Sequence, residues 1–333
     1  MTMKRALASI ATVFEDLVES VLPDRADGAP GIEPYLGYST PDALIVRGRV
    51  LAIRELDDPV RAGSAWENFQ DMAALFDTRE MENVRVACGG IETLSDEEGY
   101  FTLELPRPEG ASGWIAREVT LPDHGITTSC RALVTPADAE FGVISDIDDT
   151  MILTEAWSLR RNLWNSMTGN SASRHVFPDA VALMERLHAG RNPVFYVSSS
   201  PWNLHAFLEE MFSRAGLVQG PKFLRDLGLG SDQLVTPLTG HYGHKGDSIN
   251  TILAANPDLL FTLIGDTGQH DAQVYLDAVH RHGTAQDGGR IRHVILRVAE
   301  PVLGKDDNRA LTELQATGVK VDRVAEYSEL DLD

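Results

Sequence analysis

The stretch Val143-Ile144-Ser145-Asp146-Ile147-Asp148-Asp149-Thr150 places three acids directly behind an apolar run. In an extended chain, side chains two positions apart lie on the same side, so Asp146 and Asp148 face the same way. Two carboxylates held this close repel each other unless a positive charge lies between them. One interpretation is a solvated turn after a buried strand, because Asp is common in turns. The other is a binding site at the end of the strand, and the rest of the chain decides between them.

Short apolar runs alternate with helical patterns in residues 140–333. Strands buried on both faces are indicated by FGVISD (141–146), NPVFYVSSS (192–200), LFTLIGD (260–266) and RHVILRV (292–298). Helical periodicity lies between them, at 179–189, 201–215 and 246–255. This alternation predicts an α/β domain with a doubly wound parallel sheet. Ligands of such sheets bind at the carboxyl ends of the strands, where these runs place their polar residues.

The N-terminal part of the chain has a different sequence pattern. Residues 40–137 contain short β-rich runs bounded by Gly, Pro and Asp, at 45–53, 84–89, 100–105, 117–122 and 130–136. Their spacing predicts a small β-sandwich, and SDEEGYFTLEL (95–105) resembles the acidic turn of transthyretin-like sandwiches. An amphipathic helix is expected at 66–76, between the first strands, and another at 1–24, where an apolar stripe runs from Leu7 to Val21.

The composition of the chain limits which classes of partner it can bind. The chain has 333 residues, a net charge of -21 and two cysteines, Cys88 and Cys130. The negative charge disfavours nucleic acid, and the two cysteines are expected to be reduced thiols. No apolar run is long enough for a transmembrane segment. We therefore expect a cytoplasmic protein, or one peripheral at a membrane surface, while the oligomeric state stays open.

The polar strand ends form a recurring pattern. DIDDT (146–150), YVS (196–198), HK (244–245) and GDTGQHD (265–271) follow one another along the chain. Their order resembles the four motifs of the haloacid dehalogenase superfamily of phosphotransferases. That resemblance implies a haloacid dehalogenase-like fold and argues against a solvated turn. The short stretch between Thr150 and the next core helix leaves roughly 25 residues for a cap of little more than two helices.

The resemblance also assigns roles to residues. It implies that Asp146 attacks a phosphate monoester to give an aspartyl-phosphate, and that Asp148 serves as general acid and base. Mg2+ suits the oxygen ligands expected from Asp146, the Asp148 carbonyl and Asp266, with Asp271 as a ligand or a supporting partner. Ser198 would donate to a phosphate oxygen, and Lys245 would offset the negative charge of nucleophile and phosphoryl group.

A closer resemblance is carried by SSSPWNLHAFLEEMF (198–212), HKGDSINTIL (244–253) and GDTGQHDAQVY (265–275). These segments resemble the actin-patch phosphatidate phosphatase family, Mg2+-dependent enzymes that remove phosphate from phosphatidic acid. LIVRGRVL (44–51) and KFLRDLGL (222–229) are also similar to that family. The substrate-binding residues expected from these segments and the first motif are Thr150, Ser199, Ser200, Trp202 and Arg225.

Three functions remain open at this point. The first is a phosphatidate phosphatase-like hydrolase at a membrane surface, yielding diacylglycerol and phosphate. The second keeps the chemistry but takes a soluble or protein phosphomonoester, which the charge of -21 favours. The third is a non-catalytic module that binds phosphate or a partner.

Overall fold

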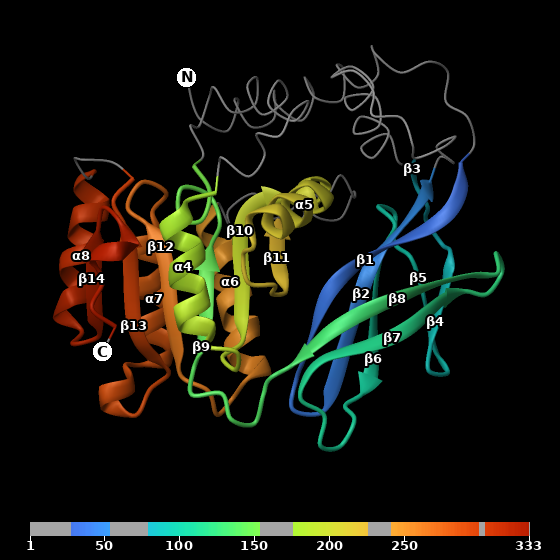
Figure 1. Ribbon diagram of the computed structural model, residues 1–333, viewed down its shortest axis with the longest axis horizontal. Helices are drawn as coiled ribbons and strands as arrows, with labels where there is room; N and C mark the ends of the chain where they lie inside the picture. The colour runs from blue at the N-terminus through green and yellow to red at the C-terminus, as the bar shows by residue number, and fades with distance from the viewer. Residues whose placement is uncertain (1–27, 54–78, 154–175, 226–240, 300–303, 333) are drawn as a thin grey trace, which may run out of the picture.

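The computed structural model describes residues 28–53, 79–153, 176–225, 241–299 and 304–332, which form two sheets side by side (Figure 1). The helices expected at 1–24 and 66–76 and the expected cap lie outside the described residues. None of the described helices is long and apolar enough to cross a membrane.

The N-terminal sheet has eight strands: β1 (Ala29–Ser39), β2 (Ala43–Ile53), β3 (Arg79–Glu80), β4 (Arg85–Cys88), β5 (Ile91–Leu94), β6 (Tyr100–Pro106), β7 (Gly113–Leu121) and β8 (Ile126–Val134). Their order is β3-β2-β1-β8-β7-β4-β5, and β6 pairs with β2. Strands β1 and β8 are parallel, whereas the other neighbours are antiparallel. Apolar side chains from β4 and β6, including Val86 and Leu103, are buried in one core.

The predicted fold class is wrong. That prediction was a doubly wound, haloacid dehalogenase-like α/β domain with a small cap, preceded by a small β-sandwich. The described chain is instead rich in strands, and its front half is one mixed sheet rather than two packed sheets. Strand β5 lies against β6, so this sheet curls almost into a barrel. The sequence signal failed because short alternating strands with regular turns occur in sandwiches and in curled sheets alike.

The second sheet is entirely parallel among the described strands. It contains β9 (Gly142–Asp146), β10 (Val194–Pro201), β11 (Lys222–Arg225), β12 (Phe261–Asp266), β13 (Ile291–Arg297) and β14 (Lys320–Val324) in the order β11-β10-β9-β12-β13-β14. Strand β9 lies in the middle of this order, and all of its residues are buried, as expected for a strand covered on both faces. The predicted strands at 141–146, 192–200, 260–266 and 292–298 are all present.

Helices cover both faces of this second sheet. They are α4 (Pro178–His188), α5 (His205–Ala215), α6 (His241–Ala255), α7 (Asp271–His282) and α8 (Lys305–Ala316). One face packs on α6, α7 and α8, and the other packs on α4 and α5. Helix α6 begins before Lys245, so this residue lies inside the helix instead of preceding it. Because β9, β10 and β12 are parallel neighbours, their carboxyl ends meet at one edge of the sheet.

Candidate active site

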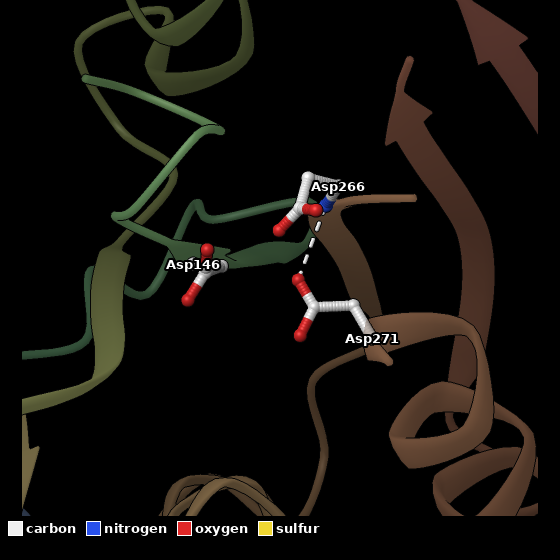
Figure 2. A group of neighbouring side chains, drawn as sticks. All are labelled: Asp146, Asp266 and Asp271. Atoms are coloured by element: carbon white, nitrogen blue, oxygen red, sulfur yellow. Dashed lines mark hydrogen bonds between the residues drawn. The ribbon is translucent and has the colours of Figure 1, made fainter. Parts of the chain in front are cut away.

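Three buried aspartates converge at that edge. Asp146 ends β9, Asp266 ends β12 and Asp271 begins α7. One carboxylate oxygen from each lies within 4.8 Å of the others, and Figure 2 shows the three side chains around a common space. Their side chains are at most 1% exposed. The sequence prediction that these acids share a site agrees with this geometry.

Lys245 brings the positive charge that the opening stretch requires. Its Nζ lies 2.7 Å from Asp146 Oδ1 and 2.6 Å from Asp271 Oδ1. Lys245 reaches the acids from α6, one turn inside the helix, and is itself buried. Burial opposes its charged form, but the carboxylates of Asp146 and Asp271 outweigh burial and raise the pKa of Lys245.

The three aspartates differ in how their oxygens are used. Asp271 Oδ1 accepts from Lys245, and its Oδ2 accepts from the Asp266 backbone N-H at 3.1 Å. Asp266 Oδ1 accepts from the backbone N-H groups of Gly268 at 2.5 Å and Gln269 at 2.9 Å. Within the described residues, Asp266 Oδ2 and Asp146 Oδ2 accept no hydrogen bond. Two buried acceptors therefore point into the site without a donor. A buried polar atom that lacks a hydrogen bond costs free energy of folding.

Burial and mutual repulsion shift the protonation of these acids. Burial, followed by the charge of Asp271, raises the pKa of Asp266 to about 8, against the opposing effect of Lys245. Burial also raises the pKa of Asp146 well above its usual range, and here Lys245 opposes while Asp271 and Asp266 add to the shift. A cation in the common space would relieve both acids.

The sequence at this edge leaves room for the acids. A Cβ on Gly265 would collide with Asp271 Oδ2, so only glycine allows the Asp271 carboxylate to lie against β12. The Tyr275 hydroxyl donates to the Ile264 carbonyl at 2.7 Å from one turn further along α7. Helix α7 is thereby held against the strand whose end carries Asp266.

A second group of side chains surrounds Asp148. The hydroxyls of Ser198 and Ser200 donate to Asp148 Oδ2 at 2.7 Å and 3.0 Å. Ser198 Oγ also accepts the backbone N-H of Ser200 at 2.9 Å. The serines end β10, beside β9, so adjacent strand ends bring them to the acid. Sequence reasoning predicted this proximity, although not that the hydroxyls would meet Asp148.

The remaining predicted residues lie around this centre. Thr150 is fully buried, and its Oγ1 has no hydrogen-bond partner in the part of the chain that the structure describes, while its carbonyl accepts from Tyr327 at 3.3 Å. Ser199 is half-buried between the two serines that meet Asp148. Arg225 ends β11 opposite Pro201, and Trp202 packs on the N-terminal sheet. Trp202 and Arg225 therefore lie toward the β11 side of the sheet.

One contact was missed by the sequence interpretation. The third acid of the opening stretch, Asp149, has a left-handed backbone with φ of 55°, which is uncommon outside glycine. Its Oδ2 accepts from the Gln269 side chain at 3.3 Å, so the loops after β9 and β12 touch. The only sequence signal was that Asp tolerates left-handed turns better than most residues.

Residues 141–298 match the family model described as "Phosphatidate phosphatase APP1, catalytic domain". The match spans β9 to β13 and contains every aspartate of the site. It confirms the predicted resemblance to the actin-patch phosphatidate phosphatase family.

A named relative agrees with the family match. The chain is 30% identical over 135 residues to "Phosphatidate phosphatase APP1" of Saccharomyces cerevisiae. The alignment covers 40% of this chain and 22% of the yeast protein, so the chain spans about a fifth of that relative. The similarity to this relative therefore covers only a part of each protein.

Proposed function

We propose that this chain is a Mg2+-dependent phosphomonoester hydrolase that acts on phosphatidate through an aspartyl-phosphate. The observation that carries the proposal is the buried cluster of Asp146, Asp266 and Asp271 around Lys245, within the segment that matches the phosphatidate phosphatase family. The family supports phosphoric monoester hydrolysis as the reaction class.

Mg2+ fits the donor set. It prefers hard oxygen ligands, and Asp146 Oδ2 and Asp266 Oδ2 are buried acceptors that no donor of the described segments reaches. Asp271 already uses both oxygens, on Lys245 and on the Asp266 backbone, so it orients the site rather than adding a free ligand. When bound, the ion would neutralise charge on the phosphoryl group.

The protein groups suit a two-step transfer. An Asp146 oxygen would attack phosphorus as the ester P-O bond breaks, and Asp148 would give its proton to the leaving alkoxide. Water would then attack the acyl phosphate, returning a proton to Asp148 and releasing phosphate. Ser198 and Ser200 hold the Asp148 side chain, and Lys245 offsets charge at the nucleophile.

The test is an assay of purified protein with Mg2+ or with EDTA. Substrates are phosphatidate in mixed micelles and a panel of soluble phosphoesters. We expect Mg2+-dependent release of phosphate from phosphatidate, and labelled phosphate on acid-quenched wild-type protein that is absent from Asp146→Asn. Turnover of soluble esters alone would make the substrate soluble, as the net charge of -21 would favour. Absence of turnover on every ester would leave a binding module.

A further inference from the structure

Strand β1 of the N-terminal sheet contacts the segment that directly follows the candidate serines. The Tyr35 ring stacks on Trp202 with centroids 4.6 Å apart and an interplanar angle of 14°. His205 Nδ1 lies 3.1 Å from Glu33 Oε1. Trp202 begins a short 3-10 helix right after β10, and His205 begins α5. Two successive contacts thus link β1 to the end of β10.

The backbone of β1 is shaped for this contact. Its pairing with β2 shifts register between Tyr35 and Tyr38, which is a β-bulge. The Arg47 guanidinium donates to the Leu36 carbonyl inside the bulge at 3.0 Å. A Cβ on Gly37 would collide with the Ile45 carbonyl, so the bulge requires glycine there. Bulges re-aim neighbouring side chains, and this one lies next to the ring that meets Trp202.

We call the contacts of Glu33 and Tyr35 with Trp202 and His205 the joint. Charged groups of α5, β2 and β11 also hold this joint in place. His205 is 4% exposed, and its Nε2 lies 3.6 Å from Glu209 Oε1. Glu209 in turn accepts from the buried Lys222 at 2.5 Å. The Arg47 guanidinium lies over the Trp202 ring, 5.3 Å from its centroid, and donates to the Lys222 carbonyl at 2.7 Å. Aromatic, cationic and ionic contacts together hold Trp202 and His205 against the N-terminal sheet.

The serines lie between this joint and the catalytic acids. Pairing of β10 with β11 shifts register between Val197 and Pro201, so residues 198–200 leave the regular ladder. Their placement then depends on what holds each end of the segment. Upstream, β10 is paired with β9 up to Val197 and Asp146. Downstream, the segment leads into Trp202, which Tyr35 covers.

We propose that Glu33 and Tyr35 are positioning residues of the active site, which hold Ser198 and Ser200 on Asp148 through Trp202 and His205. The proposal rests on the proposed function for its catalytic consequence. It makes the N-terminal sheet part of the catalytic unit, since the sheet supplies one of the two anchors of the serine segment.

The experiment compares three variants of the full chain. Tyr35→Leu removes the stacked ring, and Tyr35→Phe keeps it and loses only the 3.4 Å hydroxyl contact to Glu33. The matched control, Phe101→Leu, removes a ring of 3% exposure from the core of the N-terminal sheet. We expect Tyr35→Leu to lower kcat by about tenfold with little change in KM, because small displacements of catalytic groups are costly. Tyr35→Phe should restore the rate, and Phe101→Leu should lower Tm without lowering kcat.

Hydrogen exchange of residues 198–204 gives a readout that does not depend on turnover. Exchange of this peptide should quicken in Tyr35→Leu and not in Phe101→Leu. Equal kcat losses in the two leucine variants, or unchanged exchange in Tyr35→Leu, would overturn the proposal. If wild-type protein shows no turnover, the proposed function fails. Hydrogen exchange still tests whether Tyr35 orders residues 198–204. Should Tyr35→Leu not fold, Glu33→Ala tests the same joint by the same two readouts.

Discussion

Replacing Asp266 by asparagine is expected to stabilise the metal-free protein at neutral pH while removing its response to Mg2+. Asp266 is fully buried, and its Oδ2 accepts no hydrogen bond among the described residues. Asparagine keeps an oxygen for the backbone N-H groups of Gly268 and Gln269, so the turn after β12 stays supported. The substitution therefore removes a charge with little change in shape.

The magnitude follows from the pKa of Asp266, which is raised from 3.8 to about 8. Between these values the folded state holds a proton that the unfolded state has released, so stability falls as pH rises through this window. At about 1.4 kcal/mol per pH unit from pH 3.8 to pH 7, the Asp266 carboxyl lowers the free energy of unfolding by at most about 4 kcal/mol. The new amide N-H group lowers the free energy of unfolding by about 1–3 kcal/mol if it finds no acceptor. The net gain is about 1–3 kcal/mol, or a few degrees in Tm.

Thermal melts followed by circular dichroism test this balance, with EDTA and with Mg2+, from about pH 5 to 9. Wild-type protein with EDTA should lose stability as pH rises to about 8, whereas Asp266→Asn should show a flatter profile. Mg2+ should raise the Tm of wild type and not of the variant. The exposed Asp138→Asn serves as control for the loss of one acid. Parallel pH profiles for wild type and Asp266→Asn would refute the reasoning.

Two further substitutions probe the chemistry. Asp146→Asn should lower turnover by at least about a thousandfold, because the attacking oxygen is lost, without lowering the Tm of the metal-free protein; initial rates and melts check this, and a substantial residual rate would contradict it. Ser198→Ala should lower kcat by about tenfold, the value of one hydrogen bond, since Ser200 still donates to Asp148. A Ser198→Ala enzyme with full kcat would show that this hydroxyl has no part in the reaction.

The active-site edge was predictable from sequence because its signals are local. Asp146, Ser198 and Asp266 each follow a buried apolar strand directly, and parallel strands bring their carboxyl ends together. Lys245 lies between Asp146 and Asp271, although its helix begins earlier than expected. The order of the motifs therefore predicted which residues lie together, but it did not predict the fold class.

The N-terminal sheet could not be predicted in the same way. Strands β1 and β8 pair in parallel although most of the sheet lies between them in sequence, and no local pattern encodes that pairing. Strand β1 was not predicted at all, because prolines and glycines interrupt its apolar pattern. Because β1 was not predicted, the contact between Tyr35 and Trp202 could not be predicted either.

Charge at the site leads to the last prediction, that Mg2+ binding releases protons. If all were ionised, three carboxylates and one ammonium would leave a charge of -3 + 1 = -2 in a buried space. Lys245 contacts Asp146 and Asp271, and the pKa of about 8 at Asp266 means that this acid is protonated in metal-free protein at pH 7.

A divalent ion must displace that proton, since a protonated carboxyl is a poor ligand. The apparent affinity for Mg2+ should therefore rise with pH, by about tenfold per pH unit below pH 8 for the Asp266 proton alone. Calorimetric titrations of metal-free protein, in buffers of different ionisation enthalpy at the same pH, measure the protons released directly. At least about one proton per ion is expected for wild type at pH 7, since the pKa values of both Asp146 and Asp266 are raised, and fewer for Asp266→Asn if it binds Mg2+ at all. Binding of equal affinity at pH 6 and pH 9, without proton release, would mean that the acids are already ionised and that Lys245 alone balances them.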